Sequence, residues 1–224
     1  MRPARWPEGS VLAQVSARTR EALLGAGTPM VFPVKGVLFR HAERGDSAYL
    51  LLAGSVKVFV DSRGGAQIPL GTATEGDLVG ETAVLAEDGR RSASVQATTG
   101  VQARVLSRAV LRELVVAHPD FAISLHQMTA RRLAFANRRR VDATMKDPGV
   151  RMGRLLLDTA RRPAPGEDPA VALTQHELGF MAMMTPRTAE KVLTDFAERG
   201  AIVKEYGSVR IVRLDILRTI SDLG

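Results

Sequence analysis

The sequence predicts an α+β protein in which a roll of short strands, one long helix and a small helical unit with a hairpin follow one another. Between Val31 and Leu106, short apolar runs are separated by glycines about every ten residues. From His118 to Met145 the chain contains no glycine. Beyond residue 173, two helix-start signals precede two further short apolar runs. These three patterns predict the parts and their order.

The composition limits the kinds of protein that the chain can be. Hydrophobic residues make up 45% of the 224 residues, which is enough to build real cores. There is no cysteine, which excludes disulfides, thiolate zinc sites and cysteine-ligated iron–sulfur clusters. No run of eighteen apolar residues exists, and the N-terminus lacks the apolar core of a signal peptide. We therefore expect a cytoplasmic protein that does not enter a membrane.

Residues 1–117 are predicted to form the roll, with a short helix over residues 10–26. Short strands with glycine turns at this spacing indicate an all-β barrel or jelly roll, a double-stranded β-helix. The apolar runs include KGVLF, SAYLLLAGSVKVFV, AQIPLG and GDLVGE. An unrelated β-sandwich would give the same periodicity, so the spacing alone leaves both folds open.

Residues 118–146 are predicted to form the long helix. One apolar stripe contains Phe121, Leu125 and Met128, and a second stripe beside it includes Asn137. Two stripes indicate that the helix contacts two surfaces, its own roll and a second copy of the chain, which predicts a homodimer. In such a seam Asn137 could fix the register, although an exposed asparagine fits the sequence equally well.

The basic residues are concentrated at the end of this helix. Of the net charge of +7, +5 falls on residues 131–146, whereas residues 147–224 are neutral overall. Bulk charge therefore does not argue for nucleic acid, and only a local basic face could do so. We interpret the run Asn137–Arg140 as a solvated face of the helix.

Residues 147–224 are predicted to form a winged helix-turn-helix. Thr174, with a glutamate three residues later, is a capping box that begins one helix. Thr185, followed by a proline, begins a second helix that ends at Gly200. The short gap between them is the spacing of a helix-turn-helix, and the hairpin across residues 206–208 is the expected wing.

The second of these helices carries a candidate DNA-binding face. Arg187, Thr188 and Lys191 point outward near its N-terminus, the end that enters the major groove first. Arginine pairs with guanine, and threonine contacts phosphate or a thymine methyl group. Together with the N-cap residues Thr174 and Thr185, they form the set expected to contact double-stranded DNA. The alternative is a helical pair with ordinary exposed charges.

The stretch GETAVLAEDGRRSASV, residues 80–95, is too polar and irregular for an ordinary strand or helix. It places one carboxylate, Glu81, and one guanidinium, Arg91, beside small residues. The two charges could recognise a ligand together, or they could form a salt bridge inside an empty roll. The residue types permit either interpretation.

Most of the chain resembles the cyclic-AMP receptor protein (CRP/FNR) family of bacterial transcription regulators. The resemblance covers about residues 20–213 and rests on KGVLFRHAERGDSAYLLLAGSVKVF, GDLVGE and RRSASV, followed by the long helix and the helix-turn-helix. It implies a DNA-binding regulator controlled by a cyclic nucleotide, with cyclic AMP as the first candidate, bound in the roll beside the dimer helix. It also implies RNA polymerase as a partner.

The resemblance assigns roles to residues 80–93, which in the family form a phosphate-binding cassette. The counterpart of Glu81 accepts a hydrogen bond from the ribose hydroxyl. The counterpart of Arg91 pairs with the cyclic phosphate, and that of Ser92 donates to it. Backbone N–H groups near Gly80 and Ala93 can add donors, and a guanidinium suits phosphate oxygens.

The long helix departs from the family pattern. The two hydroxyl residues that read the adenine in the family fall here at Ala136 and Asn137. Ala136 has no hydrogen bond to offer, whereas Asn137 can donate to and accept from a purine edge. Arg132 and Asn137 lie where the ligand and the dimer seam would meet, so both are candidates to couple them.

The recognition helix departs as well. Pro186 and Arg187 stand where the family often has Arg-Glu, and Lys191 stands in place of an arginine, so we do not expect the family's usual palindrome. Met183 replaces a glycine often found in the turn, which is tolerable if its φ is negative.

No HExxH, Walker or GxSxG motif occurs, so neither an enzyme nor a catalytic residue is expected. The four histidines are scattered, and we expect neither a metal nor a haem. Two alternatives remain open. One is a regulator of the same family that needs no cyclic nucleotide, and the other is a cyclic-nucleotide-binding module without a DNA role.

Overall fold

The structure is a computed structural model that describes residues 6–62, 65, 67–160 and 168–222. The chain divides into two compact units. Residues 1–67 and 71–131 form the first unit, and residues 68–70 and 132–224 form the second. The boundary falls inside the long helix α5 (Pro119–Asp142), which begins in the first unit and ends in the second.

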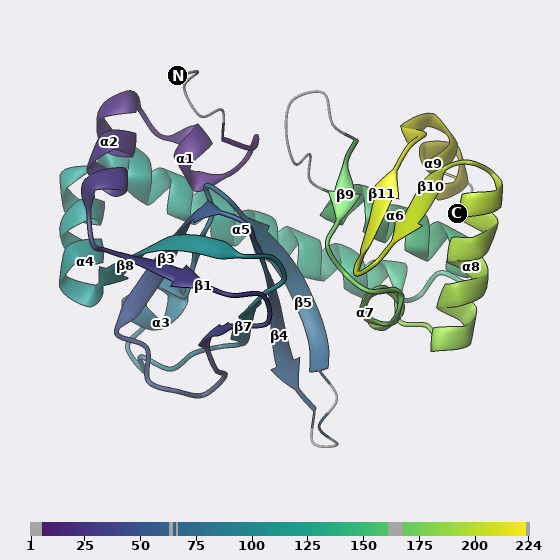
Figure 1. Cartoon of the computed structure of the whole chain (residues 1–224), viewed down its shortest axis with the longest axis horizontal. Coiled ribbons are helices and arrows are strands. Elements are labelled where there is room, and N and C mark those ends of the chain that lie inside the picture. The colour runs from purple at the N-terminus through teal and green to yellow at the C-terminus, as the bar shows by residue number, and fades with distance from the viewer. Residues whose placement is uncertain (1–5, 63–64, 66, 161–167, 223–224) are drawn as a thin grey trace. The chain divides into compact units, whose positions relative to one another are not determined.

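Two four-stranded sheets form the frame of the first unit (Figure 1). The strand order is β1-β8-β3-β6 in one sheet and β2-β7-β4-β5 in the other. Ala48 on β3 pairs with Leu106 on β8 in antiparallel register, and both side chains are buried in the core. The strands are β1 (Thr28–Phe32), β2 (Val37–Phe39), β3 (Ser47–Ala53), β4 (Ser55–Asp61), β5 (Gln67–Thr74), β6 (Leu78–Val79), β7 (Ser94–Ala97) and β8 (Val101–Ser107).

Short helices accompany the sheets of the first unit. Three of them begin at a serine whose hydroxyl accepts a hydrogen bond from a backbone N–H of the first turn, because that N–H has no partner within the helix. These caps are Ser10, Ser16 and Ser107. The helices are α1 (Val11–Gln14), α2 (Ala17–Gly25), α3 (Glu81–Leu85) and α4 (Arg108–Ala117).

The first half of α5 packs on the roll. Phe121, Leu125 and Met128 are buried in one hydrophobic cluster together with Leu50 and Leu106 of the sheet. The inward stripe predicted for the long helix is therefore confirmed. The helix ends at Asp142, a few residues before the predicted end.

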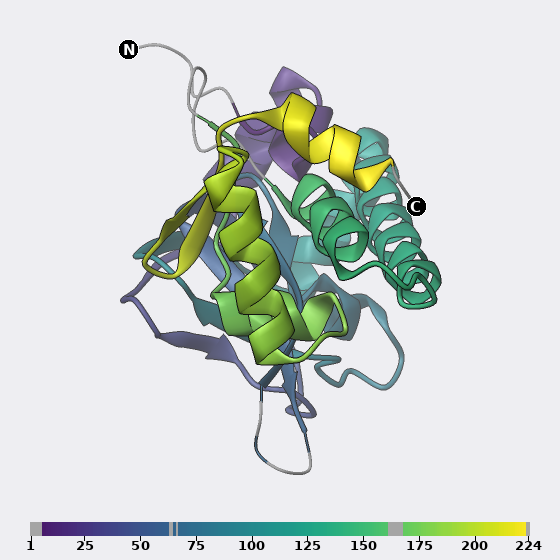
Figure 2. The same cartoon turned by 90° about the vertical axis from the view of Figure 1, so that its right-hand side faces the viewer.

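The second unit contains the helix-turn-helix and its wing (Figure 2). Its small sheet has the strand order β10-β11-β9, and α8 buries Ala189, Val192, Leu193 and Phe196 in a core shared with α6. The elements are α6 (Pro148–Thr159), β9 (Ala170–Val171), α7 (Gln175–Met181), α8 (Pro186–Glu198), β10 (Ile202–Glu205), β11 (Ser208–Ile211) and α9 (Leu214–Ser221).

The predicted α+β fold, with a roll, a long helix and a winged helix-turn-helix, is confirmed. Two elements of the second unit were not predicted from the sequence. Strand β9 adds a third strand to the wing by pairing Val171 with Val209, and helix α9 buries Leu217 and Ile220 against the same core.

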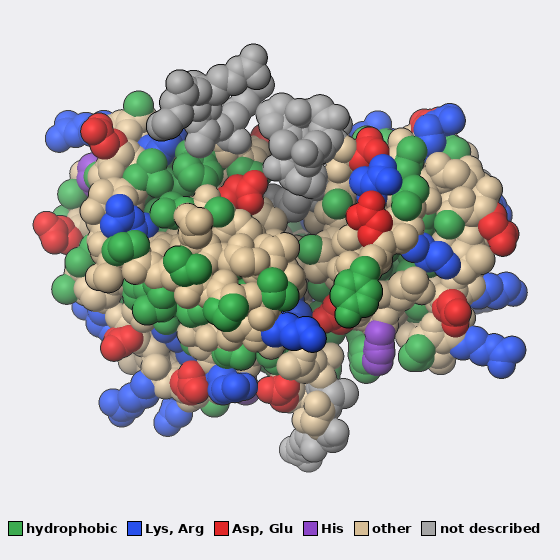
Figure 3. Space-filling model, in the orientation of Figure 1, with side chains coloured by type: hydrophobic (Ala, Val, Ile, Leu, Met, Phe, Trp, Pro, Cys, Tyr) green, Lys and Arg blue, Asp and Glu red, His purple; other side chains and the backbone are tan. Residues whose placement is uncertain are grey.

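The surface of the second unit shows side chains of both charges, in keeping with the neutral balance of residues 147–224, which form most of it. Acidic and basic side chains are interspersed on the face seen in Figure 3, so no continuous basic surface covers that face. In the described part of the chain, no helix is long and apolar enough to cross a membrane.

Candidate functional site

The cassette, residues 80–93, lies between strands β6 and β7 of the roll. Gly80 follows β6 in the left-handed region, with a φ of 82°, a conformation that costs glycine little because it has no Cβ. This turn places Glu81 as the first residue of α3. On the other side, the Arg91 N–H donates to the Glu43 carbonyl and the Ala42 N–H donates to the Arg91 carbonyl, both at 2.9 Å. The backbone on both sides of the cassette is thus held in place.

The guanidinium of Arg91 is buried inside the cassette. The residue is 4% exposed, and its Nη1 donates to the Gly80 carbonyl at 2.9 Å. Its Cζ lies 4.1 Å from the centroid of the Phe39 ring and 6.0 Å from that of Tyr49. Burial lowers the pKa of Arg91, against the attraction of Tyr49 and nearby carboxylates. The positive charge of the guanidinium is therefore largely shielded from water.

No ion pair joins Arg91 to a carboxylate among the described residues, so the predicted alternative of a Glu81–Arg91 salt bridge is wrong. Glu81 is also buried, at 4% exposure, and its Oε1 accepts a hydrogen bond from the Thr82 hydroxyl at 3.1 Å. The Nε of Arg91 is buried, and no hydrogen-bond acceptor for it lies in the described residues. Because a buried donor without an acceptor costs free energy, this geometry is suited to an anion that arrives from outside the chain.

The remaining cassette residues differ in exposure. Ser92 is exposed at the surface, Ala93 is buried, and Gly80 is half-buried. The structure thus brings Gly80, Glu81, Arg91, Ser92 and Ala93 together in the first unit. Their roles toward a ligand stay predictions.

Sequence reasoning missed the two aromatic residues of the site. Phe39 on β2 and Tyr49 on β3 have ring centroids 5.6 Å apart, and both rings lie near the Arg91 guanidinium. Only 4% of the chain is aromatic. The available signal was therefore one aromatic residue in each of two successive predicted strands, but the pairing of these rings with an arginine depends on the sheet arrangement.

Arg132 and Asn137 lie on α5, in the part of the helix that belongs to the second unit. Both are exposed in the single chain. Their proposed coupling of ligand and dimer seam stays a prediction.

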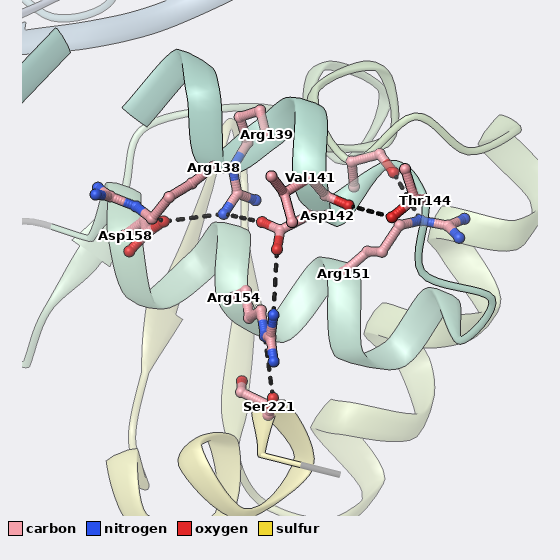
Figure 4. A network of polar contacts seen from close by, with 10 residues as sticks. Arg138, Arg139, Val141, Asp142, Thr144, Arg151, Arg154, Asp158 and Ser221 are labelled. Carbon is pink, nitrogen blue, oxygen red and sulfur yellow. Dashed lines mark hydrogen bonds and ion pairs between the residues drawn. The ribbon is translucent and has the colours of Figure 1, made fainter. Parts of the chain in front are cut away.

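The basic run at the end of α5 takes part in a network of ion pairs (Figure 4). Arg139 Nη2 lies 2.6 Å from Asp142 and 2.9 Å from Asp158, and Arg154 Nη1 lies 3.3 Å from Asp142. Arg138 joins through Asp158 at 3.1 Å. The Arg139 side chain is 10% exposed, so the interpretation of this run as a solvated face is wrong for that residue.

The helix-turn-helix begins as the sequence predicts. The Thr174 hydroxyl accepts from the Glu177 N–H at 3.2 Å and the Glu177 carboxylate accepts from the Thr174 N–H at 2.8 Å, which completes the capping box. The Thr185 hydroxyl accepts from the Thr188 N–H at 3.2 Å and begins α8. Thr174, Thr185 and two further residues of the predicted set, Arg187 and Lys191, are exposed, and Thr188 is half-buried.

The turn between α7 and α8 differs from the prediction. Met183 has a φ of 51°, so it adopts the left-handed region in spite of its side chain. The requirement of a negative φ is therefore not met. Met183 is exposed and borders a shallow hollow of about 630 Å³ on the second unit, lined by Lys146, Pro148, Arg151, Phe180, Met183, Met184, Thr185 and Thr188.

Two family models match the chain. The model of the cyclic nucleotide-binding domain matches residues 29–118, and the model of the Crp-like helix-turn-helix domain matches residues 150–220. The first match contains the cassette, and the second contains the helix-turn-helix with its wing.

Similar proteins and solved structures agree with these two family models. The chain is 31% identical over 187 residues to the CRP-like cAMP-activated global transcriptional regulator of Mycobacterium tuberculosis, covering 82% of this chain and 83% of the relative. It is 25% identical over 184 residues to the cAMP-activated global transcriptional regulator CRP of Escherichia coli O157:H7, covering 81% and 87%. The solved structure of the c-di-GMP responsive global regulator CLP of Xanthomonas campestris shares the fold, with a TM-score of 0.70 and 20% identity over 88% of this chain and 99% of that chain.

A cyclic nucleotide-binding roll followed by a Crp-like helix-turn-helix defines a DNA-binding regulator. The chain belongs to the CRP/FNR family of transcription regulators, which are not enzymes. The resemblance read from the sequence is confirmed. The alternative of a nucleotide-binding module without a DNA role is set aside, because the chain carries the Crp-like helix-turn-helix.

Proposed function

We propose that the roll binds a cyclic nucleotide, with cyclic AMP as the first candidate, and that this binding controls how a homodimer binds double-stranded DNA. The observation that carries the proposal is the Arg91 guanidinium, buried beside Phe39 with an Nε that lacks an acceptor in the described residues. A cyclic phosphate supplies the missing acceptor and the missing negative charge. The names of the two cAMP-activated relatives favour cyclic AMP.

Within this proposal, each cassette residue has one task. Arg91 pairs with the cyclic phosphate, and the exposed Ser92 hydroxyl donates to it. Backbone N–H groups near Gly80 and Ala93 add donors, and Glu81 accepts a hydrogen bond from the ribose hydroxyl. Arg132 and Asn137 on α5 contact the base or the partner helix, with Asn137 as the group that can read a purine edge.

The proposed homodimer forms through α5. Ile123, Ala130, Ala134 and Val141 are exposed and follow one another at intervals of seven, four and seven residues, so they share one face of the helix. Ile123 and Val141 are 58% and 61% exposed. A second copy of the same helix would cover this face, and Asn137 lies on it.

The proposed division of labour follows the chain. Residues 1–117 form the sensor roll, residues 118–146 the dimerisation helix, and residues 147–224 the DNA-binding domain. A ligand beside the long helix favours one dimer geometry and shifts the population toward dimers whose recognition helices are one DNA turn apart. Such a regulator acts in the cytoplasm and contacts RNA polymerase.

The DNA side of the proposal rests on the exposed N-terminal turn of α8. Arg187 and Lys191 reach bases or phosphates, and Thr174, Thr185 and Thr188 contact the backbone. A bidentate base contact contributes about 1–3 kcal/mol, so Arg187→Ala should weaken operator binding about ten- to hundredfold. Lys191→Ala is the matched control, because loss of a phosphate contact weakens binding to all sequences alike and lowers its salt dependence.

The test is fluorescence anisotropy on labelled promoter DNA from upstream of the gene, with and without cyclic AMP. Wild type should bind more tightly with the nucleotide, Arg91→Ala should lose that response, and Arg187→Ala should lose affinity with the response retained. Equal DNA affinity with and without nucleotide would instead identify a family member that needs no cyclic nucleotide.

A further inference from the structure

We propose that Phe39 is a positioning residue, which holds the Arg91 guanidinium so that one edge faces an incoming phosphate. The inference rests on the proposed function, since it concerns how the same site receives its ligand. It adds a residue that lies outside the cassette, on strand β2.

The ring of Phe39 covers one face of the guanidinium. Phe39 is 9% exposed, and its ring centroid lies 4.1 Å from Arg91 Cζ, well inside the range of a cation–π contact. A desolvated cation is attracted to a ring face more strongly than an exposed one. Because no described carboxylate pairs with Arg91, the ring is a principal favourable contact of this charge within the chain.

The sheet register places the ring. Phe39 pairs with Val95 on β7, four residues after Arg91, and the register between β2 and β7 shifts between Val37 and Phe39. Such an irregularity re-aims the side chains of the strand that carries it. The strand that follows the cassette is therefore bonded to the residue whose ring covers Arg91.

Gly45 and Gly80 lie so close to the guanidinium that a side chain at either position would collide with it. A Cβ on Gly45 would lie 2.6 Å from Arg91 Nε and 2.7 Å from Cζ, and a Cβ on Gly80 would lie 2.5 Å from Nη1. Nη1 is already bonded to the Gly80 carbonyl. The plane of the guanidinium is thus fixed by a ring on one side, glycine backbone around it and a carbonyl at one nitrogen.

The edge of the guanidinium formed by Nε and Nη2 is the part that these contacts leave for a ligand. Nε is buried and has no hydrogen-bond acceptor in the described part of the chain, and the hydrogen bond to the Gly80 carbonyl is made by Nη1. This is the edge that binds two oxygens of a phosphate in parallel. Holding it in one orientation before the ligand arrives reduces the ordering cost of binding.

The test compares three variants with wild type by calorimetric titration with cyclic AMP. Phe39→Leu keeps an apolar side chain but removes the ring face, and we expect affinity to fall about tenfold. Pentafluorophenylalanine at position 39 keeps the shape of the ring and reverses its quadrupole, and it should give a similar loss. Phe196→Leu is the control, because that buried ring packs in the hydrophobic core of the second unit; the affinity of this variant should stay at the wild-type value.

A second readout needs no ligand. The Nε–H of Arg91 should give a slowly exchanging signal in NMR spectra of the free wild type, and this signal should be lost or exchange faster in the fluorinated variant. Unchanged affinity and unchanged exchange in both Phe39 variants would overturn the proposal while leaving the proposed function standing. A wild type that binds no cyclic nucleotide would overturn the proposed function, and the exchange rate would then decide separately whether Phe39 positions Arg91.

Discussion

Two arginines of this chain with largely desolvated side chains are held in opposite ways. Arg139, in the second unit, lies within ion-pair distance of Asp142 and Asp158. Arg91, in the first unit, is held by the Gly80 carbonyl and the Phe39 ring, and no described carboxylate pairs with it. Burial lowers the pKa of both. An arginine neutralised within the chain holds the fold together, whereas one that is buried without a counter-charge is placed to meet an external anion.

The difference between the two arginines is tested most strongly by making the same substitution at both sites. Arg139→Met leaves Asp142 buried with its main partner gone, and we expect a loss of roughly 2–3 kcal/mol in the free energy of unfolding. Arg91→Met removes a desolvated charge together with one hydrogen bond and the contacts with the Phe39 and Tyr49 rings, so the free energy of unfolding should stay within about 1 kcal/mol of wild type in the absence of ligand. Urea unfolding of both variants measures the difference.

Exposed Arg138, which shares Asp158 with Arg139, provides the control for that pair. Its side chain is 55% exposed, so Arg138→Met should change stability by less than about 1 kcal/mol. Equal losses in the Arg91 and Arg139 variants would mean that Arg91 is a structural residue, and the contrast between the two sites would fail.

The sequence predicted the cassette and missed what surrounds it. Glu81 and Arg91 are recognisable because the motif keeps them in one short stretch, but the contacts of the Arg91 guanidinium depend on where the Gly80 carbonyl and the Phe39 ring lie. The run Asn137–Arg140 was interpreted as solvated because the sequence near it does not contain Asp158. This carboxylate lies on the next helix and forms ion pairs with Arg138 and Arg139. Local patterns predicted elements well, since caps and glycine turns are local. Contacts across helices and strands had no local signal.

A second comparison concerns the left-handed turns of the two units. The cassette uses Gly80 at a φ of 82°, whereas the helix-turn-helix uses Met183 at 51°. A residue with a side chain is destabilised by about 1–2 kcal/mol in this region. Glycine avoids this strain, but its unfolded chain has more conformational entropy, which offsets part of the gain. Met183→Gly should therefore raise the free energy of unfolding by roughly 0.5–1 kcal/mol. A loss of stability on urea unfolding would mean that the Met183 side chain contributes packing that outweighs the strain.

The smallest expected effect concerns a carboxylate held by neutral donors instead of arginines. The Ser16 N–H and the Thr19 hydroxyl donate to Asp120 at 2.8 and 2.7 Å, and these hydrogen bonds lower the pKa of Asp120 to about 2. Because the folded-state pKa is depressed, the stabilisation is complete above the unfolded value near pH 4 and is lost as the pH falls toward 2.

Urea midpoints of wild type and Asp120→Asn should therefore differ at pH 5 and converge toward pH 2. Glu21→Gln removes an exposed carboxylate on α2 and should parallel wild type over the same range. A constant gap between wild type and Asp120→Asn at all pH values would contradict the assigned cause.

The central claim is that Arg91 is an anion-binding group, and the most direct measurement is calorimetric titration of the purified protein with cyclic AMP, repeated with cyclic GMP and with Arg91→Met. The account predicts saturable binding of a cyclic nucleotide by wild type and at least about a hundredfold weaker binding by the variant, because a charge-assisted bidentate contact is lost. The variant should remain folded by circular dichroism. Binding of equal strength in Arg91→Met, or no binding of either nucleotide by folded wild type, would contradict it.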